Sequence, residues 1–182
     1  MTSRPVYAVF VAGGSGTRMG GDLPKQFMDL EGTPVLQRSI ERFLDACNDA
    51  RVITVLPERY ISLWSKMCLE RGVTFSQTLV KGGMTRFHSV QNALEKVPDG
   101  AIVAIHDGVR PLLTEKLIRG MLGKMDTCRA LIPVVPVVDT LFTDDASVAE
   151  RYGIPLTFTE GERYNIKITT PEDLELAKLL IS

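Results

Sequence analysis

The chain has 182 residues, of which 45% are hydrophobic and 24% charged, and its formal net charge is −1. This length suits one domain, residues 1–182, with a substantial core, and the composition is ordinary for a soluble globular protein. The small net charge excludes a global attraction to nucleic acid or to an anionic membrane, so any binding of phosphate must be local.

Cysteine usage and the absence of long apolar runs narrow the class further. Cys47, Cys68 and Cys128 are odd in number and form no Cys-x-x-Cys motif. They indicate thiols in a reducing compartment rather than a disulfide framework or a zinc site. No run approaches membrane-spanning length, and the start of the chain lacks a signal-peptide pattern. We therefore expect a cytoplasmic protein that engages neither membrane nor nucleic acid.

The first predicted element is an apolar strand, Val6–Val11, which leads into a glycine-rich loop, Ala12-Gly13-Gly14-Ser15-Gly16-Thr17-Arg18-Met19-Gly20. The loop is neither a P-loop nor a dinucleotide fingerprint, because Arg18 and Met19 stand where those motifs need glycine. Glycines let backbone N–H groups approach an anion, and Arg18 and Lys25 add positive charge. The pattern favours a nucleoside triphosphate site over a plain strand-to-helix turn.

Strand-like and helical patterns then alternate almost to the end of the chain. Further strands are predicted at 52–56, 73–79, 101–105 and 130–135, with amphipathic stretches at helical spacing between them. This order predicts a Rossmann-like α/β fold, in which a mostly parallel twisted sheet lies between two helical layers. The near-continuous apolar run at 101–105 predicts a central strand covered on both faces. The last helix should begin after Thr170, which caps it, with Pro171 in its first position.

Polar residues follow several of these strands, as expected where ligands bind at the carboxyl edge of a parallel sheet. Gly82-Gly83 and Ser89 could hold a nucleobase or ribose, or form an ordinary turn. Asp107 could bind magnesium, or could cap a helix or pair with Arg110. Lys167, next to a helix N-terminus, could contact an anion, although a lone lysine is usually solvated.

No nucleophile arrangement accompanies these residues, since neither Gly-x-Ser-x-Gly nor His-Glu-x-x-His occurs. The chemistry indicated is transfer at phosphorus, which depends on position and charge rather than on covalent catalysis.

Taken in order, the motifs resemble a known family over nearly the whole chain. The glycine loop with Pro24-Lys25-Gln26-Phe27 resembles the signature of sugar-phosphate nucleotidylyltransferases. Later motifs are similar to the 2-C-methyl-D-erythritol 4-phosphate cytidylyltransferases of non-mevalonate isoprenoid biosynthesis: Gly82-Gly83 with Arg86 and Ser89, His106-Asp107-Gly108-Val109-Arg110-Pro111, Asp139-Thr140, Thr143-Asp144-Asp145-Ala146-Ser147 and Asn165-Ile166-Lys167-Ile168-Thr169.

The resemblance implies that CTP and a polyol phosphate give a CDP-polyol and pyrophosphate, with Mg²⁺. It implies three catalytic residues, Arg18, Lys25 and Lys167, and polyol-phosphate contacts at Arg110, Thr140 and Lys167. It places CTP against Ala12, Gly13, Gly14, Ser15, Gly16, Gly82, Gly83, Ser89 and Asp107, the last of which would assist Mg²⁺ or the ribose edge. The implied partners are these small molecules and a second copy in a homodimer.

Two other functions stay open at this point. Ribitol-5-phosphate cytidylyltransferases share most of these motifs, although the segment from Thr143 to Val148 favours the isoprenoid enzyme. A non-catalytic nucleotide-binding module of the same fold is the second. The presence of both Arg18 and Lys25 argues against it, because a binder needs less charge at the α-phosphate.

One departure from the family lies between Thr140 and Thr143. There the family has an arm of a few dozen residues that embraces a second subunit and carries an arginine to its site. Here only Leu141-Phe142 join the two motifs. Either the chain lacks the arm or the printed sequence omits it. We favour omission, because a deletion would remove the dimer contact and part of the substrate site.

Overall fold

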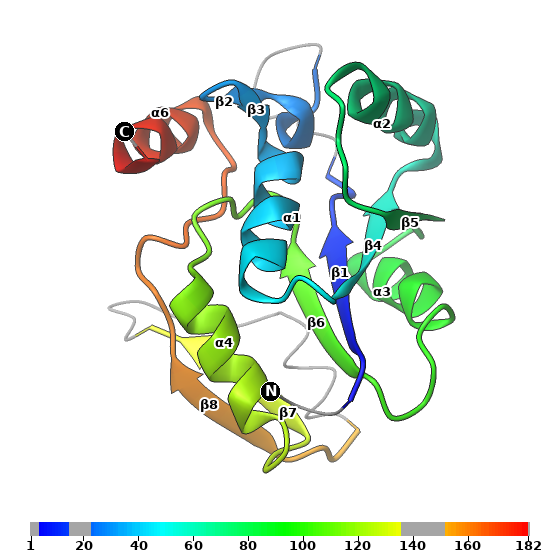
Figure 1. Cartoon of the computed structure of the whole chain (residues 1–182), viewed down its shortest axis with the longest axis vertical. Coiled ribbons are helices and arrows are strands. Elements are labelled where there is room, and N and C mark those ends of the chain that lie inside the picture. The colour runs from blue at the N-terminus through cyan, green and yellow to red at the C-terminus, as the bar shows by residue number, and fades with distance from the viewer. Residues whose placement is uncertain (1–3, 15–22, 136–151, 182) are drawn as a thin grey trace.

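The computed structural model describes residues 4–14, 23–135 and 152–181. Its centre is a parallel four-stranded sheet in the order β5-β4-β1-β6 (Figure 1). The strands are β1 (Val6–Val11), β4 (Arg51–Leu56), β5 (Gln77–Lys81) and β6 (Ile102–Asp107). All four carboxyl ends therefore meet at one edge of the sheet.

Helices cover both faces of this sheet and confirm the predicted three-layer α/β/α arrangement. Alternate side chains of β1 divide between the faces, because successive residues of a strand point to opposite sides. Ala8 and Phe10 pack with α1 (Val35–Ala46), α2 (Glu58–Glu70) and α4 (Glu115–Lys124). Tyr7 and Val9 pack on the other face with α3 (Arg86–Leu94). The strand is buried along its whole length, as its apolar sequence predicts.

The remaining elements surround the carboxyl edge. They are the 3-10 helix η2 (Lys25–Phe27), the short antiparallel pair β2 (Asp29–Leu30) and β3 (Thr33–Pro34), and α6 (Pro171–Ile181). The predicted start of α6 is confirmed, since the Asp173 amide donates to Thr170 Oγ1 and Asp173 Oδ2 accepts from the amides of Thr169 and Thr170. Leu174 and Ala177 of α6 pack with Leu30.

The third strand lies further along the chain than the 73–79 pattern predicts. The Val73 amide donates to the carbonyl of Cys68, which uses this residue to close the end of α2. Pairing with β4 therefore begins only at Gln77, opposite Val52. The apolar pattern that begins at Val73 therefore predicts a longer strand than the chain forms, because its first residue belongs to the end of α2.

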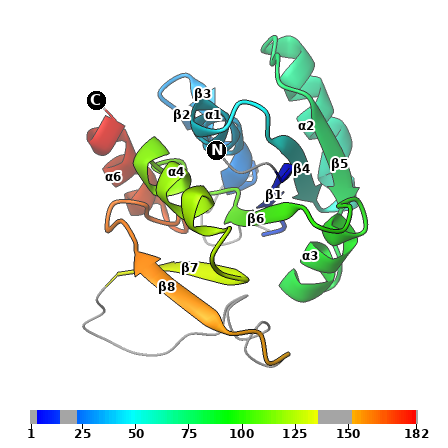
Figure 2. The same ribbon diagram turned by 60° about the horizontal axis from the view of Figure 1, so that its bottom comes forward.

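The strand predicted at 130–135 forms, but within the described residues it does not join the central sheet. β7 (Ala130–Val134) pairs in parallel with β8 (Leu156–Glu160) and forms a separate two-stranded sheet. Within the described ranges, β6 is therefore an edge strand, although its apolar sequence predicts a central one. Figure 2 shows β7 on the side of β8 that faces β6.

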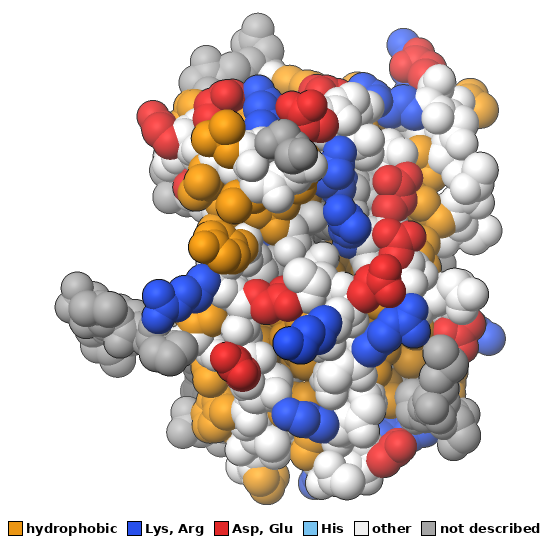
Figure 3. Space-filling model, turned by 60° about the vertical axis from the view of Figure 1, so that its left-hand side comes forward, with side chains coloured by type: hydrophobic (Ala, Val, Ile, Leu, Met, Phe, Trp, Pro, Cys, Tyr) orange, Lys and Arg blue, Asp and Glu red, His pale blue; other side chains and the backbone are white. Residues whose placement is uncertain are grey.

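Charged side chains of both signs are mixed over the face shown in Figure 3, with no broad patch of one sign. This agrees with the net charge of −1. Among the described helices, none is both long enough and apolar enough to cross a bilayer.

Candidate active site

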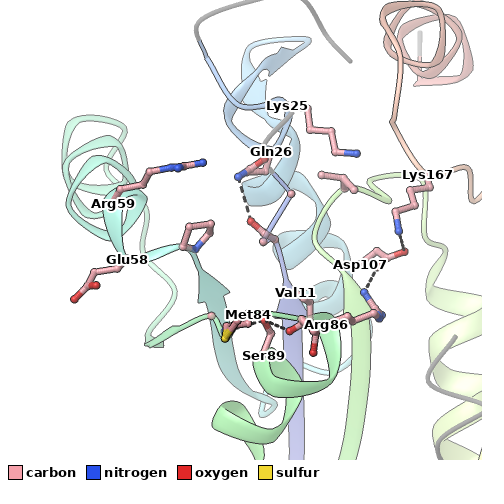
Figure 4. A pocket seen from close by; sticks show the side chains of 18 residues that line it. Val11, Lys25, Gln26, Glu58, Arg59, Met84, Arg86, Ser89, Asp107 and Lys167 are labelled. Atoms are coloured by element: carbon pink, nitrogen blue, oxygen red, sulfur yellow. Dashed lines mark hydrogen bonds and ion pairs between the residues drawn. The ribbon is translucent and has the colours of Figure 1, made fainter. Parts of the chain in front are cut away.

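A pocket of about 600 Å³ opens at the carboxyl edge of the sheet (Figure 4). Its walls come from the end of β1, from η2, from the starts of α2 and α3, and from the end of β6. The described lining residues used below are Ala12, Gly13, Gly14, Lys25, Glu58, Arg59, Gly82, Gly83, Arg86, Ser89, Asp107 and Lys167. The structure thus brings together most of the predicted site residues, from five separate stretches of the chain.

Lys25 is held in the wall of this pocket by its two neighbours. Gln26 is buried and donates through Nε2 to the Ala12 carbonyl at 3.1 Å. The Phe27 ring stacks on Trp64 with a centroid distance of 5.8 Å and an interplanar angle of 20°. Trp64 is in turn fixed, since its Nε1 donates to Gln77 Oε1 at 3.0 Å. Figure 4 shows the Lys25 side chain reaching into the pocket from η2.

The turn between β5 and α3 is closed by the Ser89 hydroxyl. Ser89 Oγ accepts from the Gly83 amide at 3.0 Å and donates to the Thr85 carbonyl at 2.9 Å. Thr85 caps α3 by accepting from the His88 amide. Ser89 lines the pocket as predicted, but its hydroxyl is engaged within the turn. In this geometry Ser89 shapes the turn that presents Gly82 and Gly83.

Gly83→Ala should distort this turn. A Cβ at Gly83 would lie 2.3 Å from His88 Cβ and 2.9 Å from the His88 carbonyl carbon, so the backbone must shift. We expect a stability loss of about 1–3 kcal/mol from overpacking. From the role that the resemblance implies for this turn, we also expect about tenfold weaker nucleotide binding, because the wall is displaced. Thermal unfolding and calorimetric titration with CTP measure the two effects.

Gly120→Ala is the matched control, since Gly120 lies within α4 and a Cβ there meets nothing within 4 Å. Alanine at a helix interior should raise stability by about 0.5–1 kcal/mol. If Gly83→Ala changed stability and CTP binding no more than Gly120→Ala does, the turn would have space for a Cβ, and the predicted clash with His88 would be wrong.

Asp107, at the end of β6, holds three cations from different parts of the chain. Its Oδ1 lies 2.6 Å from Arg86 Nη1, and its Oδ2 lies 3.0 Å from both Arg110 Nε and Lys167 Nζ. Arg110 also donates to the Asn165 carbonyl at 2.8 Å. Lys167 is further positioned because the next residue, Ile168, is buried and its amide donates to the Val109 carbonyl at 2.9 Å.

These cations control the charge state of Asp107. Burial acts to raise the pKa of its carboxyl, but Arg86 and Lys167 outweigh burial and hold the pKa well below its usual range. The carboxylate is therefore ionised at any working pH, and both its oxygens are engaged. In this geometry, Arg86, Arg110 and Lys167 compete with any divalent cation for the oxygens of Asp107. Among the described residues, no group of three His, Cys, Asp or Glu side chains could hold a metal ion.

Sequence reasoning did not assign a role to Arg86, Arg59 or Gln26. Arg86 and Ser89 stand three residues apart at the start of α3, so they share a helix face, and that spacing could have marked Arg86. Arg59 is the second residue of α2, which follows β4 after Pro57, and no site residue was predicted after that strand. Counting the described lining residues, four cations face two carboxylates, so the pocket carries net positive charge that suits a polyphosphate.

Four predicted site residues, Ser15, Gly16, Arg18 and Thr140, lie outside the described residues, as does the Leu141-Phe142 join. Of the others, Ala12, Gly13 and Gly14 follow β1 at the pocket wall. Arg110 does not line this pocket, but it is linked to it through Asp107.

Comparisons with known proteins extend over nearly the whole chain. The family model described as IspD, 2-C-methyl-D-erythritol 4-phosphate cytidylyltransferase, matches residues 6–143 and 141–182. A relative of that name from Bacteroides fragilis is 37% identical, covering 96% of this chain and 98% of its own length. One from Porphyromonas gingivalis is also 37% identical, covering 97% of both.

Solved structures support the same fold. The 4-diphosphocytidyl-2C-methyl-D-erythritol synthase from Anaerococcus prevotii matches with a TM-score of 0.81 at 20% identity and covers 99% of both chains. The 2-C-methyl-D-erythritol 4-phosphate cytidylyltransferase from Thermus thermophilus matches with a TM-score of 0.73 at 24% identity, covering 97% of this chain and 98% of its own.

The alignments also show a length difference. The alignment with the Bacteroides fragilis relative spans 215 positions and includes 96% of this 182-residue chain, about 175 residues, so about 40 of its positions have no counterpart here. The two segments of the family match meet at 141–143, where the motifs Asp139-Thr140 and Thr143-Asp144-Asp145 adjoin. The family model matches the chain on both sides of this point. The chain is a nucleotidyltransferase, and it belongs to the 2-C-methyl-D-erythritol 4-phosphate cytidylyltransferase family.

Proposed function

We propose that this enzyme joins CTP to 2-C-methyl-D-erythritol 4-phosphate, giving the CDP-methylerythritol of non-mevalonate isoprenoid biosynthesis and pyrophosphate. The observation that carries the proposal is the meeting of Lys25 and Lys167 in one cation-rich pocket at the carboxyl edge of the sheet. Relatives that are 37% identical and align with nearly the whole of this chain bear the name of this activity.

In the proposed reaction, a phosphate oxygen of the polyol phosphate attacks the α-phosphorus of CTP. A P–O bond forms there while the bond from the α-phosphorus to the bridging oxygen breaks, and pyrophosphate leaves with that oxygen. No group of the protein becomes covalently attached. The enzyme acts by holding the two phosphates in line and by stabilising the charge that develops on their oxygens.

The residues divide between the two substrates. Gly13 and Gly14, together with Ser15, Gly16 and Arg18, would hold the triphosphate, and Lys25 would stabilise charge at the α-phosphate. The turn at Gly82-Gly83 would hold the nucleoside. On the other side of Asp107, Lys167 and Arg110 would hold the polyol phosphate, with Thr140 beside them.

Asp107 then has a positioning role in this proposal. Its two oxygens orient Arg86, Arg110 and Lys167 and keep three cations together that would otherwise repel one another. Mg²⁺ is also part of the proposal. It would neutralise charge on the triphosphate, and the engaged carboxylate of Asp107 supports coordination by phosphate oxygens rather than by this side chain.

The proposal also includes a cytoplasmic location for the enzyme and its assembly as a homodimer. The small net charge and the thiols noted above support the first. For the second, the segment that would embrace a partner is not among these 182 residues. Sedimentation velocity across a range of protein concentrations measures the association directly.

Pyrophosphate release from CTP tests the function. With Mg²⁺ present, we expect release with 2-C-methyl-D-erythritol 4-phosphate and at least about 100-fold less with ribitol 5-phosphate, because a polar site rejects a misfitting polyol strongly. Faster release with ribitol 5-phosphate would assign the other cytidylyltransferase activity. Nucleotide binding without release from either substrate would indicate a binding module.

A further inference from the structure

Arg59 is a cation of the active-site pocket to which the proposed function assigns no role. It lies in the first turn of α2 and lines the pocket. Figure 4 shows its side chain reaching from α2 toward the side of the pocket where Lys25 lies. Among the described residues, no carboxylate forms an ion pair with Arg59, whereas Asp107 holds both Arg86 and Lys167. The charge of Arg59 is therefore available to a ligand.

The aromatic packing that supports Lys25 also supports Arg59. The guanidinium carbon of Arg59 lies over the Tyr60 ring, 4.7 Å from its centroid. Tyr60 packs edge-on against Phe27 at a centroid distance of 5.8 Å, and Phe27 is two residues from Lys25 in η2. A guanidinium that stacks on a ring can still donate through the N–H groups at its edge. Arg59 and Lys25 are thus positioned by one set of packed rings.

The start of α2 adds to the positive potential around Arg59. Pro57 precedes the helix, and no side chain among the described residues caps it, so its first amides have no side-chain acceptor. Glu58 is the acidic residue of this turn, but in Figure 4 its side chain points away from Arg59, and it pairs with Lys81 at 2.5 Å. The positive end of the helix therefore meets the pocket with little opposing charge.

The order of the strands places Arg59 and the polyol-phosphate residues on opposite sides of the glycine loop. In the order β5-β4-β1-β6, the glycine loop follows β1, Asp107 ends β6 on one side of it, and Arg59 follows β4 on the other. Asp107 holds Lys167, which the proposed function assigns to the polyol phosphate. In Figure 4, Lys25 is seen between Arg59 and Lys167. An α-phosphate at Lys25 would therefore have Lys167 on one side and Arg59 on the other.

The direction of phosphoryl transfer relates this arrangement to the leaving group. The attacking and leaving oxygens lie roughly in line, on opposite sides of the phosphorus. The attacking oxygen of the polyol phosphate comes from the side of Lys167. The bridging oxygen leaves with the electron pair of the broken P–O bond, so negative charge grows on the departing pyrophosphate, on the side of Arg59. The planar guanidinium can donate to two oxygens of such a group at once.

We propose that Arg59 binds the β- and γ-phosphates of CTP and stabilises the pyrophosphate as it leaves. The inference rests on the proposed function, which supplies the positions of the two substrates. Arg59 shares the pyrophosphate with the glycine loop and with the start of α2, whereas Lys25 acts at the α-phosphate.

Calorimetric titration of the wild type and of Arg59→Gln with CTP, CMP and inorganic pyrophosphate, each with Mg²⁺, tests this contact. CMP has the same nucleoside and α-phosphate as CTP but lacks the other two phosphates. We expect Arg59→Gln to bind CTP and pyrophosphate about tenfold more weakly, the loss expected for one charge-assisted hydrogen bond, and to bind CMP as the wild type does. Arg59→Lys keeps the charge without the planar fork, so it should recover part of the lost affinity.

Lys66→Gln is the matched control. It removes the same charge from an exposed position on the same helix, where Lys66 pairs with Glu70. We expect it to leave all three affinities unchanged, because charges at exposed positions are screened by solvent. Thermal unfolding of both glutamine variants confirms that they are folded.

Unchanged CTP binding by Arg59→Gln would overturn the proposal. An equal loss of CTP and CMP affinity would also overturn it, because the contact would then be with the nucleoside or the α-phosphate. An equal loss in Lys66→Gln would reduce it to a long-range effect of charge. The proposed function can fail separately. If CTP binding depends on Arg59 as expected but no pyrophosphate is released with 2-C-methyl-D-erythritol 4-phosphate, the contact with the β- and γ-phosphates stands and the assigned reaction is wrong.

Discussion

Replacing Lys25 with methionine should lower kcat about 10²- to 10³-fold, the loss expected when one electrostatic contact to a developing oxyanion is removed. Lys25 is only 9% exposed and its aliphatic part lies near Gly14, so methionine preserves the packing while removing the charge. The KM for CTP should change much less than kcat if Lys25 acts mainly in the transition state. Steady-state pyrophosphate release with both substrates measures the two constants.

Two further variants make this result interpretable. Lys25→Ala should show the same loss of kcat, and similar melting temperatures of the two variants would exclude unfolding as the cause. Lys66→Ala is the surface control, since Lys66 is exposed and forms a surface pair with Glu70 at 3.6 Å. A Lys25→Met enzyme with near-normal kcat would contradict the proposed mechanism.

Asp107→Asn should reduce both stability and activity. It leaves Arg86, Arg110 and Lys167 together without their shared anion, and breaking a buried pair in this way costs several kcal/mol. Because the three cations are 34–42% exposed, we expect a smaller loss of about 2–3 kcal/mol. For a chain of this length, the melting temperature should fall by about 5–10 °C. The KM for the polyol phosphate should rise, because Lys167 and Arg110 lose their orientation.

The pH dependence gives a sharper signature. Since the folded-state pKa of Asp107 is depressed, its contribution to stability is present above the unfolded pKa of about 4 and is lost as the pH falls further. Urea unfolding of wild type and Asp107→Asn should differ by a constant amount between pH 5 and 7, and the difference should shrink toward pH 3. Glu70→Gln, which changes an exposed carboxylate, should show neither effect. A difference that grows on acidification would exclude the ion cluster as its cause.

Local patterns in the sequence predict most of the layered fold. The apolar run of β1 and the capping residues around Thr170 each specify one structure, and both are found where predicted. The placement of β6 is the main exception. Its apolar residues indicate that its two faces can be buried, but they do not indicate which strands pair with its edges, because those strands lie far along the chain. The shift of β5 has a local cause, since Val73 serves the end of α2.

The site shows the same division. The residues expected at the carboxyl edge, such as Gly82 after β5 and Asp107 at the end of β6, are brought together because parallel strands end at one side of the sheet. The partners of Asp107 could not be read in the same way. Arg110 is near in sequence, but Arg86 and Lys167 reach it from α3 and from the segment before α6. Which cations pair with Asp107 depends on their distances in the folded protein, and these distances cannot be read from the spacing of the residues along the chain.

Trp64 gives the molecule a built-in optical reporter. It is the only tryptophan in the sequence, its side chain is fully buried, and its indole stacks on Phe27, two residues from Lys25. Any ligand that moves η2 must disturb the surroundings of this one fluorophore. The emission spectrum of the unlabelled protein should therefore follow occupation of the pocket, with no background from a second indole.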